Sequence, residues 1–283
     1  MKIRSLLVSI LLYSCANAPQ KLPVVFNFPD KLKEVSAVEI TAKSSLIWVC
    51  EDSGNKAELY ALDAEGKIAN TVSIKNADNN DWEDLTSDKD GNIYIGDFGN
   101  NDNTRENLAI YKINAADLTK TEAQIAQKVE FYYPGQKDFP PKKSQRFYDC
   151  EAFFFYNDNF YLFTKNRSSK FDGTTLLYKV ANKTGRNAAQ LIGQFKTCDE
   201  FRKCAITSAD ISPDGKKIIL LSCAKVWVFE DYGNDNFFNG KMREIDLKHY
   251  SQKEGIGFVG NSEVYISDEK EKKTGGKVYD LEL

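Results

Sequence analysis

The sequence has a single histidine, and this scarcity removes several classes of protein from consideration. His249 lies in a polar connector and nothing near it resembles a nucleophile elbow, so a Ser-His-Asp hydrolase has little support. A zinc site has no support either, because the chain also lacks a C-x-x-C pair. No glycine-rich loop follows a strand and opens a helix, which excludes nucleotide binding of the Rossmann or P-loop type.

An excess of positive charge is also missing. The chain has 38 lysines and arginines against 41 aspartates and glutamates, which gives a net charge of −3. Lysine-rich stretches such as residues 269–273 alternate in sign and are expected to be solvated loops. Without a basic stripe the chain is a poor candidate for binding nucleic acid, so we expect no nucleic-acid partner.

Long apolar runs are absent, and the one near the N-terminus is short. Leu6–Leu12 follows a basic start and is too short to span a bilayer, so residues 1–14 are expected to be a signal peptide. Leu12-Tyr13-Ser14-Cys15 resembles a bacterial lipobox, which implies cleavage before Cys15, lipidation of its thiol and a tether over residues 15–22. Ordinary cleavage after Ala16-Asn17-Ala18 is the alternative, which Pro19 disfavours.

The expected lipid anchor determines the compartment. We expect the protein in the envelope of a Gram-negative bacterium, held to the membrane only by its lipid. No acidic cluster follows Cys15, which favours the periplasmic side over surface display. The mature chain is expected to be a monomer with a net charge of about −5, because residues 1–14 carry two positive charges and no negative ones. Its partner, a ligand or another envelope protein, is not named by the sequence.

Five cysteines remain beyond Cys15, so at least one of them has no partner within the chain. Cys198 and Cys204 lie six residues apart in a polar loop, a spacing that suits a small disulfide in an export compartment. Cys50 and Cys223 lie inside apolar strands and are expected to be buried small hydrophobic residues.

Aromatic residues are plentiful, and they indicate strands. The 18 phenylalanines and 14 tyrosines lie largely in short runs with period-two alternation. Only residues 115–129 are expected to form a helical or irregular insertion. One phrase recurs: a small or acidic head, an apolar strand, a polar turn and a second strand. Its five heads are Ser36, Glu83, Glu151, Ala209 and Glu254.

This repeat predicts an all-β fold, a five-bladed β-propeller in a single domain over residues 23–283. The spacing between heads leaves room for two inner and two outer strands in each unit, but the last unit lacks its outermost strand. We expect Val24–Phe28 to pair with the C-terminal strand and close the ring, which removes two exposed sheet edges. A six-bladed propeller is the alternative, with an extra blade inside residues 112–146.

Several motifs resemble, in order and over nearly the whole mature chain, those of a family of secreted bacterial propellers. That family is largely uncharacterised and is similar to SdiA-regulated and phytase-like propellers. The resemblance implies the propeller fold, but it says almost nothing about an activity. The chain departs from the family at Glu51-Asp52, where Asn-Asp is usual, and at Ser36-Ala37, where Ser-Gly is usual. The motifs are Glu34–Ala37, Leu46–Val49, Asp52–Asn55, Asp81–Leu85, Gly96–Asn101 with Arg105, Asp149–Ala152, Ser208–Gly215 and Glu254–Ile256.

A propeller brings the heads of the five phrases and the ends of the second strands to one face, around the axis. We therefore expect any ligand on this face. The candidate ligand-binding residues are Glu83, Asp84, Asp97, Arg105, Asp149, Glu151, Lys165, Arg167, Asp210 and Glu254.

Three glutamates close to the axis would repel one another, and their pKa values would rise unless something compensates. One compensator is a calcium ion, which takes six to eight oxygen ligands. The candidate metal ligands are Glu83, Glu151, Asp210 and Glu254, completed by water. In a second interpretation each glutamate accepts backbone N–H groups of a neighbouring blade and pins the two blades together. In a third, the glutamates form ion pairs with Lys165, Arg105 or Arg167.

Two functions follow from these residues, and whether the chain is an enzyme stays open. The first is a lipid-anchored binding module that takes a ligand or partner on its acidic axial face, with calcium as the candidate ion. The alternative is a calcium-dependent phosphoester hydrolase, in which Lys165, Arg167 or Arg105 would meet the phosphate.

Overall fold

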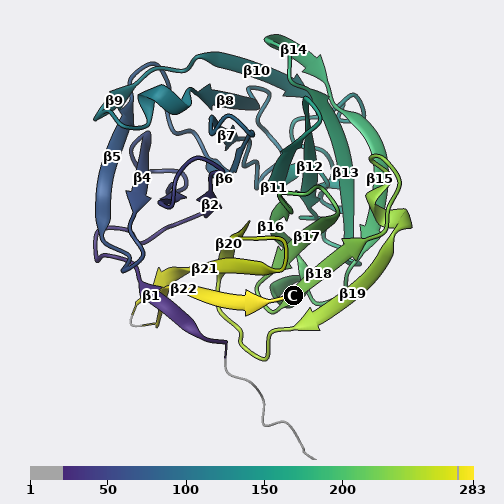
Figure 1. Ribbon diagram of the computed structural model, residues 1–283. Coiled ribbons are helices and arrows are strands. Elements are labelled where there is room, and N and C mark those ends of the chain that lie inside the picture. Colours follow the sequence, from purple (N-terminus) through teal and green to yellow (C-terminus); the bar gives the residue numbers. More distant parts are fainter. Residues whose placement is uncertain (1–21, 273) are drawn as a thin grey trace, which may run out of the picture.

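The computed structural model describes residues 22–272 and 274–283, and the predicted signal peptide and Cys15 lie outside them. Five sheets radiate from a common axis, and their innermost strands are β2, β6, β11, β16 and β20 (Figure 1). The predicted five-bladed β-propeller is therefore confirmed. Residues 112–146, where a sixth blade was the alternative, complete the outer parts of blades 1 and 2 instead.

Each blade is an antiparallel meander in which consecutive strands pair from the axis outward. Blade 1 contains β2 (Glu39–Ile40), β3 (Ile47–Val49), β4 (Glu58–Leu62) and β5 (Ile68–Ile74). Blade 2 contains β6 (Trp82–Ser87), β7 (Ile93–Asp97), β8 (Ala109–Ile113) and β10 (Gln127–Tyr132). Blade 3 contains β11 (Asp149–Tyr156), β12 (Asn159–Lys165), β13 (Thr174–Ala181) and β15 (Gln190–Lys196). Blade 4 contains β16 (Ile206–Ile211), β17 (Lys217–Ser222), β18 (Lys225–Glu230) and β19 (Lys241–Asp246).

Blade 5 is built from both ends of the chain, as the sequence predicts. It contains β20 (Lys253–Phe258), β21 (Glu263–Glu271) and β22 (Thr274–Glu282), and β1 (Val24–Asn27) pairs antiparallel with β22. Phe26 of β1 is buried against Gly66, whose positive φ of 78° and lack of a side chain leave room for the ring. In Figure 1 the first strand lies directly beside the last one.

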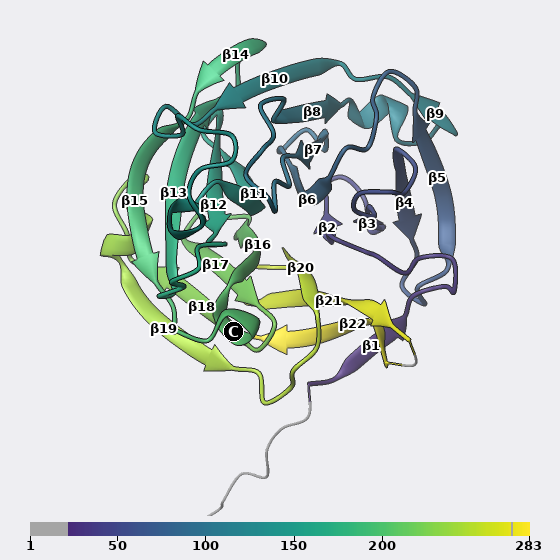
Figure 2. The ribbon, with the colours of Figure 1, turned by 180° about the vertical axis from the view of Figure 1, so that it is seen from behind.

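Two outer strands reach back to the preceding blade. β9 (Glu122–Ala123) leaves the connection between β8 and β10 and pairs in parallel with β5. β14 (Gly185–Ala188) leaves blade 3 and pairs in parallel with β10. Seen from behind in Figure 2, both lie on the outer rim of the ring. The predicted insertion at 115–129 thus contains one helical turn, β9 and the start of β10.

In residues 22–272 and 274–283, helical structure is confined to four short pieces, namely η1 (Ala115–Asp117), η2 (Lys143–Gln145), α1 (Phe201–Cys204) and η3 (Phe237–Asn239). Within the described part of the chain, no helix has the length and apolar character that a membrane span requires.

Aromatic rings fill the spaces between the blades. Between blades 2 and 3, Phe98 and Phe153 meet edge to face with their centroids 5.1 Å apart, and both rings are completely buried. Edge-to-face contacts of this kind stabilise the packing between blades beyond the effect of the buried area alone. Because the aromatic side chains lie between the blades, the polar residues at the ends of the inner strands lie around the axis of the propeller.

Candidate functional site

A β-bulge interrupts the innermost strand in four of the five blades. In each case the pairing with the second strand skips one residue, and that extra residue is Glu83, Glu151, Thr207 or Glu254. A bulge re-aims the side chain of its extra residue, which otherwise would follow the alternation of the strand. Three bulges therefore turn a glutamate toward the axis.

The register corrects one alignment made from the sequence. The head of the blade-4 phrase was taken as Ala209, but the skipped residue is Thr207, two positions earlier. The reason is that a bulge changes the alternation of the strand, and counting apolar residues along the sequence does not detect the change. With Thr207 as the head, Asp210 lies three positions after the head. It therefore corresponds to Thr86 of blade 2 and to Glu39 of blade 1.

A pocket of about 360 Å³ opens on the axis at the level of the bulges. Its lining has six carboxylates, two cationic groups and four neutral polar side chains, and no aromatic ring among the described residues. The lining residues are Ser36, Asp52, Ser53, Asp81, Glu83, Asn101, Glu151, Lys165, Arg167, Gln252, Glu254 and Glu269.

The blade-3 wall of the pocket is internally neutralised. Glu151 pairs with Lys165, and its other oxygen accepts a bond of 2.6 Å from the Arg167 guanidinium. Arg167 also donates from Nε to Asp149 at 2.5 Å. Asp149 is fully buried and in turn accepts the backbone N–H of Asn100 in blade 2 at 2.7 Å. On this wall, therefore, the charge of Glu151 is compensated by ion pairs, as in the third interpretation above.

The blade-2 wall is different, because neither Asp81 nor Glu83 forms an ion pair with a described residue. Glu83 is only 8% exposed, and no hydrogen bond or ion pair among the described residues involves its carboxylate. A Cβ placed on Gly99 would lie 2.2 Å from Glu83 Oε1 and 2.4 Å from Asp81 Oδ2. The two carboxylates thus converge over the same glycine, and only a residue without a side chain fits beneath them.

The pKa values of the pocket carboxyls reflect this arrangement. Burial raises the pKa of Glu83 well above its usual range, and repulsion by Glu151 and Asp81 adds to the effect. Burial likewise raises the pKa of Glu151 to about 8, against the pull of Lys165. The pKa of Glu269 is raised to about 9 by burial and by Glu254. The pocket therefore disfavours the ionised state of its own acids, and a bound cation would reverse this.

Asp84 lies below the pocket and pins blades together. Its Oδ2 accepts the backbone N–H of Phe153 in blade 3 and the hydroxyl of Ser208 in blade 4, both at 3.2 Å. Asp84 is 1% exposed and does not line the pocket. The blade-pinning interpretation, proposed for the glutamates, describes this aspartate instead.

Asp210 also lies below the pocket, apart from the three glutamates with which it was predicted to hold a metal. Its carboxylate accepts the backbone N–H groups of Ile211 at 2.7 Å and of Phe258 in blade 5 at 2.8 Å. One acidic neighbour is Glu39 of blade 1, whose pKa is raised by burial and by Asp210. The pairing register, two residues along the strand from the expected place, explains this position.

Asp97, Arg105 and the fully buried Asp149 are the other predicted site residues outside the pocket lining. Arg105 donates to Asp97 at 2.8 Å and to the carbonyl of Gly99 at 2.7 Å. Asp97 is fully buried and accepts a further bond of 2.9 Å from the Tyr111 hydroxyl. The pair holds the turn after β7, including Gly99, in place under the pocket wall. His249 lies outside the pocket lining, with Nδ1 2.9 Å from Lys253 Nζ.

Several pocket residues were not among the sequence candidates. Asp81 lies immediately before β6, two positions from Glu83, and Glu269 lies within β21. Asp52 was named as part of a family motif and not as a site residue. The missed lining residues are Ser36, Asp52, Ser53, Asp81, Asn101, Gln252 and Glu269.

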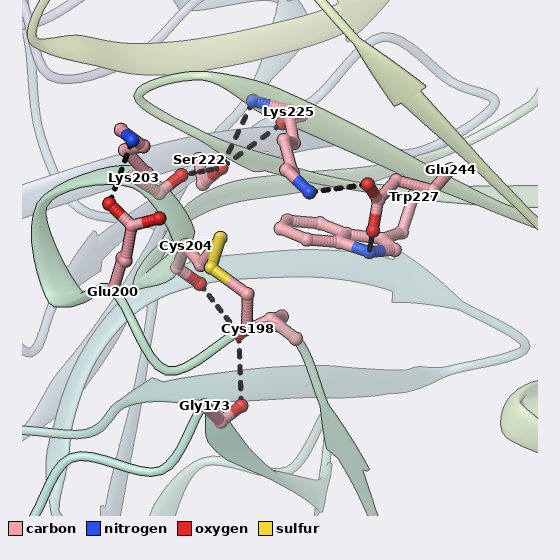
Figure 3. The surroundings of a disulfide bond; sticks show 10 residues. Gly173, Cys198, Glu200, Lys203, Cys204, Ser222, Lys225, Trp227 and Glu244 are labelled. Carbon is pink, nitrogen blue, oxygen red and sulfur yellow. Dashed lines mark hydrogen bonds and ion pairs between the residues drawn. A yellow bond between two sulfur atoms is a disulfide. The ribbon is translucent and has the colours of Figure 1, made fainter.

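A disulfide loop supports the cationic wall from outside. Cys198 and Cys204, the pair proposed from their spacing, are joined by a disulfide that encloses α1 (Figure 3). The Ser222 hydroxyl donates to the Lys203 carbonyl at 2.6 Å and fastens the loop to blade 4. On the same loop the Phe201 ring lies 5.5 Å from the Arg167 guanidinium carbon, so the loop contacts a residue of the pocket.

No family model matches the chain, and no curated protein matches it. Among solved structures it is similar to the PQQ-bound aldose sugar dehydrogenase of Streptomyces coelicolor, with a TM-score of 0.51 and 8% identity over 93% of this chain and 97% of that one. It is also similar to the gluconolactonase XC5397 of Xanthomonas campestris (TM-score 0.47, 13% identity, 88% and 72% coverage) and to the Dos1 propeller (0.41, 12%, 83% and 53%). At these identities a likeness shows the β-propeller fold alone.

Proposed function

We propose that the protein is a binding module of the cell envelope that takes a positively charged ligand into its axial pocket. The observation that carries the proposal is the Glu83 carboxylate, which is nine-tenths buried, lines the pocket and forms no hydrogen bond or ion pair with a described residue. Burying a carboxylate without a cation or hydrogen bonds is costly, so such a group favours a cationic ligand beside it. The pocket as a whole has four more carboxylates than cations.

Calcium is the first ion to test. The chemistry of the lining suits it, because carboxylate, hydroxyl and amide oxygens are its ligands. The spacing suits it less: within residues 22–272 and 274–283, no three histidine, cysteine, aspartate or glutamate side chains are grouped to hold one metal ion. Calcium binding would therefore require Asp81, Glu83 and their neighbours to move toward one another.

The experiment is a calorimetric titration of the mature chain with calcium chloride, accompanied by thermal melts. If the pocket binds the ion, the melting temperature rises with calcium, and Glu83→Gln combined with Asp81→Asn abolishes the rise. The matched control is Glu65→Gln, which removes one negative charge at an exposed turn far from the pocket lining. Absence of heat and of any shift in the wild type would remove calcium as the ligand.

The phosphoester hydrolase stays the alternative, and the same protein tests it. Both cationic groups of the lining, Lys165 and Arg167, already pair with carboxylates, so a phosphate would have to compete with Glu151 and Asp149 for them. This arrangement favours the binding module. Phosphoester turnover that a chelator stops would reverse the preference.

The location in the envelope is part of the proposal and is supported by the lipobox-like sequence ending at Cys15 and by the resemblance to secreted propellers. Labelling of cells with a palmitate analogue should mark the wild-type protein. Cys15→Ala should remove the label and release the protein from the membrane fraction. A membrane-bound Cys15→Ala protein would contradict the lipid anchor.

A further inference from the structure

We infer that the ligand is a linear aliphatic polyamine, an organic cation with two or more primary or secondary ammonium groups. This inference rests on the proposed function, since it names the class of cation that the axial pocket accepts. Its first support is size. The pocket measures about 360 Å³, which is the share of liquid volume of about twelve water molecules. A bare ion would occupy a small part of this space, whereas pockets for organic ligands begin near 300 Å³.

The second support is the separation of the negative groups. Asp81 and Glu83 converge over Gly99 on the blade-2 side. Glu254 and Glu269 come from β20 and β21 of blade 5, and repulsion by Glu254 adds to the effect of burial in raising the pKa of Glu269. No three of these groups surround a common point within the described residues. Two separate anionic subsites match two ammonium groups joined by a spacer better than they match one ion.

The third support is the kind of hydrogen-bonding group in the lining. An ammonium group has three donors and no acceptor, so it needs oxygen atoms around it. Ser53 and Asn101 offer such oxygens near the Asp81–Glu83 subsite, and Gln252 offers one beside Glu254. The cations that would repel the ligand, Lys165 and Arg167, are already paired with Glu151 and Asp149, and they also attract Glu254.

The lining also distinguishes between classes of organic cation. Quaternary ammonium groups are recognised by aromatic cages, in which the rings face the methyl groups. None of the described residues that line this pocket is aromatic. The pocket is therefore suited to primary and secondary amines, which donate hydrogen bonds, and not to choline-like ligands.

Calorimetric titration of the mature protein with a series of amines tests the inference. The probes are butylamine, putrescine, spermidine, choline and calcium chloride, all at about 0.15 M salt, where interactions between distant exposed charges are screened. We expect the affinity to increase about tenfold or more from butylamine to putrescine and again to spermidine, with choline the weakest. An order of this kind follows if each ammonium group meets its own carboxylates.

Two variants locate the subsites. Glu83→Gln and Glu269→Gln should each weaken spermidine binding about tenfold, and Glu65→Gln should leave it unchanged. If Glu83→Gln does not fold, Asp81→Asn tests the same subsite. Equal binding of all amines, or no effect of either subsite variant, would overturn the inference. Calcium binding without amine binding would overturn the polyamine and leave the proposed function intact. Binding of none of the probes would overturn both.

Discussion

Ser208 donates a hydrogen bond from its hydroxyl to Asp84 at 3.2 Å and so joins two blades that are not neighbours in the ring. The relay continues on both sides. Asp84 accepts the backbone N–H of Phe153, and Ser208 accepts that of Ile256 at 3.1 Å. Four of the five blades are thus connected through two side chains at the centre, directly below the pocket.

Replacing Asp84 should destabilise the protein without removing its ligand. Asp84→Ala leaves the buried N–H groups of Phe153 and Leu85 without an acceptor, which should lower the free energy of unfolding by about 2 kcal/mol or more. Urea denaturation measures the loss, and titration with the cation should show an unchanged affinity. A double-mutant cycle with Ser208→Ala should give a coupling above about 0.5 kcal/mol. Additive effects would show that the relay does not act as a unit.

The stability of the ligand-free protein should fall as the pH rises from 5 to 8. The pKa of Glu269 is raised to about 9 and that of Asp52 to about 7, both mainly by burial, whereas the unfolded chain titrates near pH 4. Over this window the folded state binds more protons than the unfolded state, so each increase in pH favours unfolding. The pKa of Lys253, lowered to about 8 by burial, affects stability in the opposite direction, chiefly above this window.

Thermal melts at constant ionic strength between pH 5 and 8 measure this dependence. Glu269→Gln should make the curve flatter, and Glu65→Gln should not. Saturation with the cationic ligand should also reduce the slope, because the ligand stabilises the ionised carboxylates. A melting temperature that is constant or rises over the window would mean that these carboxyls are not protonated in the folded protein.

Loss of the disulfide should affect both stability and the pocket. Cys198→Ala with Cys204→Ala should lower the free energy of unfolding by about 2 kcal/mol, because the short loop is no longer closed in the unfolded state. The contact of Phe201 with Arg167 should also loosen, which should weaken ligand binding by a few-fold. Denaturation curves and titrations of the variant should match those of reduced wild-type protein. Identical curves for oxidised protein and variant would contradict a stabilising role.

The blades could be predicted from the sequence because their signals are local. Side chains alternate between the two faces of each strand, turns are marked by Asp-Gly and Gly-Asn pairs, and the phrase repeats at the scale of one blade. Pairing of Val24–Asn27 with β22 could be predicted by counting strands. The last blade lacked its outermost strand, and the strand at the N-terminus belonged to no other blade.

The parts that escaped prediction depend on contacts between distant segments. Thr207 is the bulged residue of β16 because of its pairing with β17, and Ala209-Asp210 imitates the Glu-Asp phrase of blade 2 closely enough to conceal this. Asp81 joins the pocket because the turn ending at Gly99 folds beneath it. β9 has only two residues and no periodicity of its own, and its partner β5 lies in another blade.

The two parallel outer strands give the assembly of the ring a direction. β9 completes blade 1 but belongs to the chain that builds blade 2, and β14 completes blade 2 but belongs to blade 3. During synthesis from the N-terminus, each of these blades keeps an open edge until its successor has emerged. β1 is made first and finds its partner β22 last. A nascent chain therefore has at least one unpaired strand edge throughout its synthesis. Interruption of synthesis shortly before β22 would leave a nearly complete ring that cannot close.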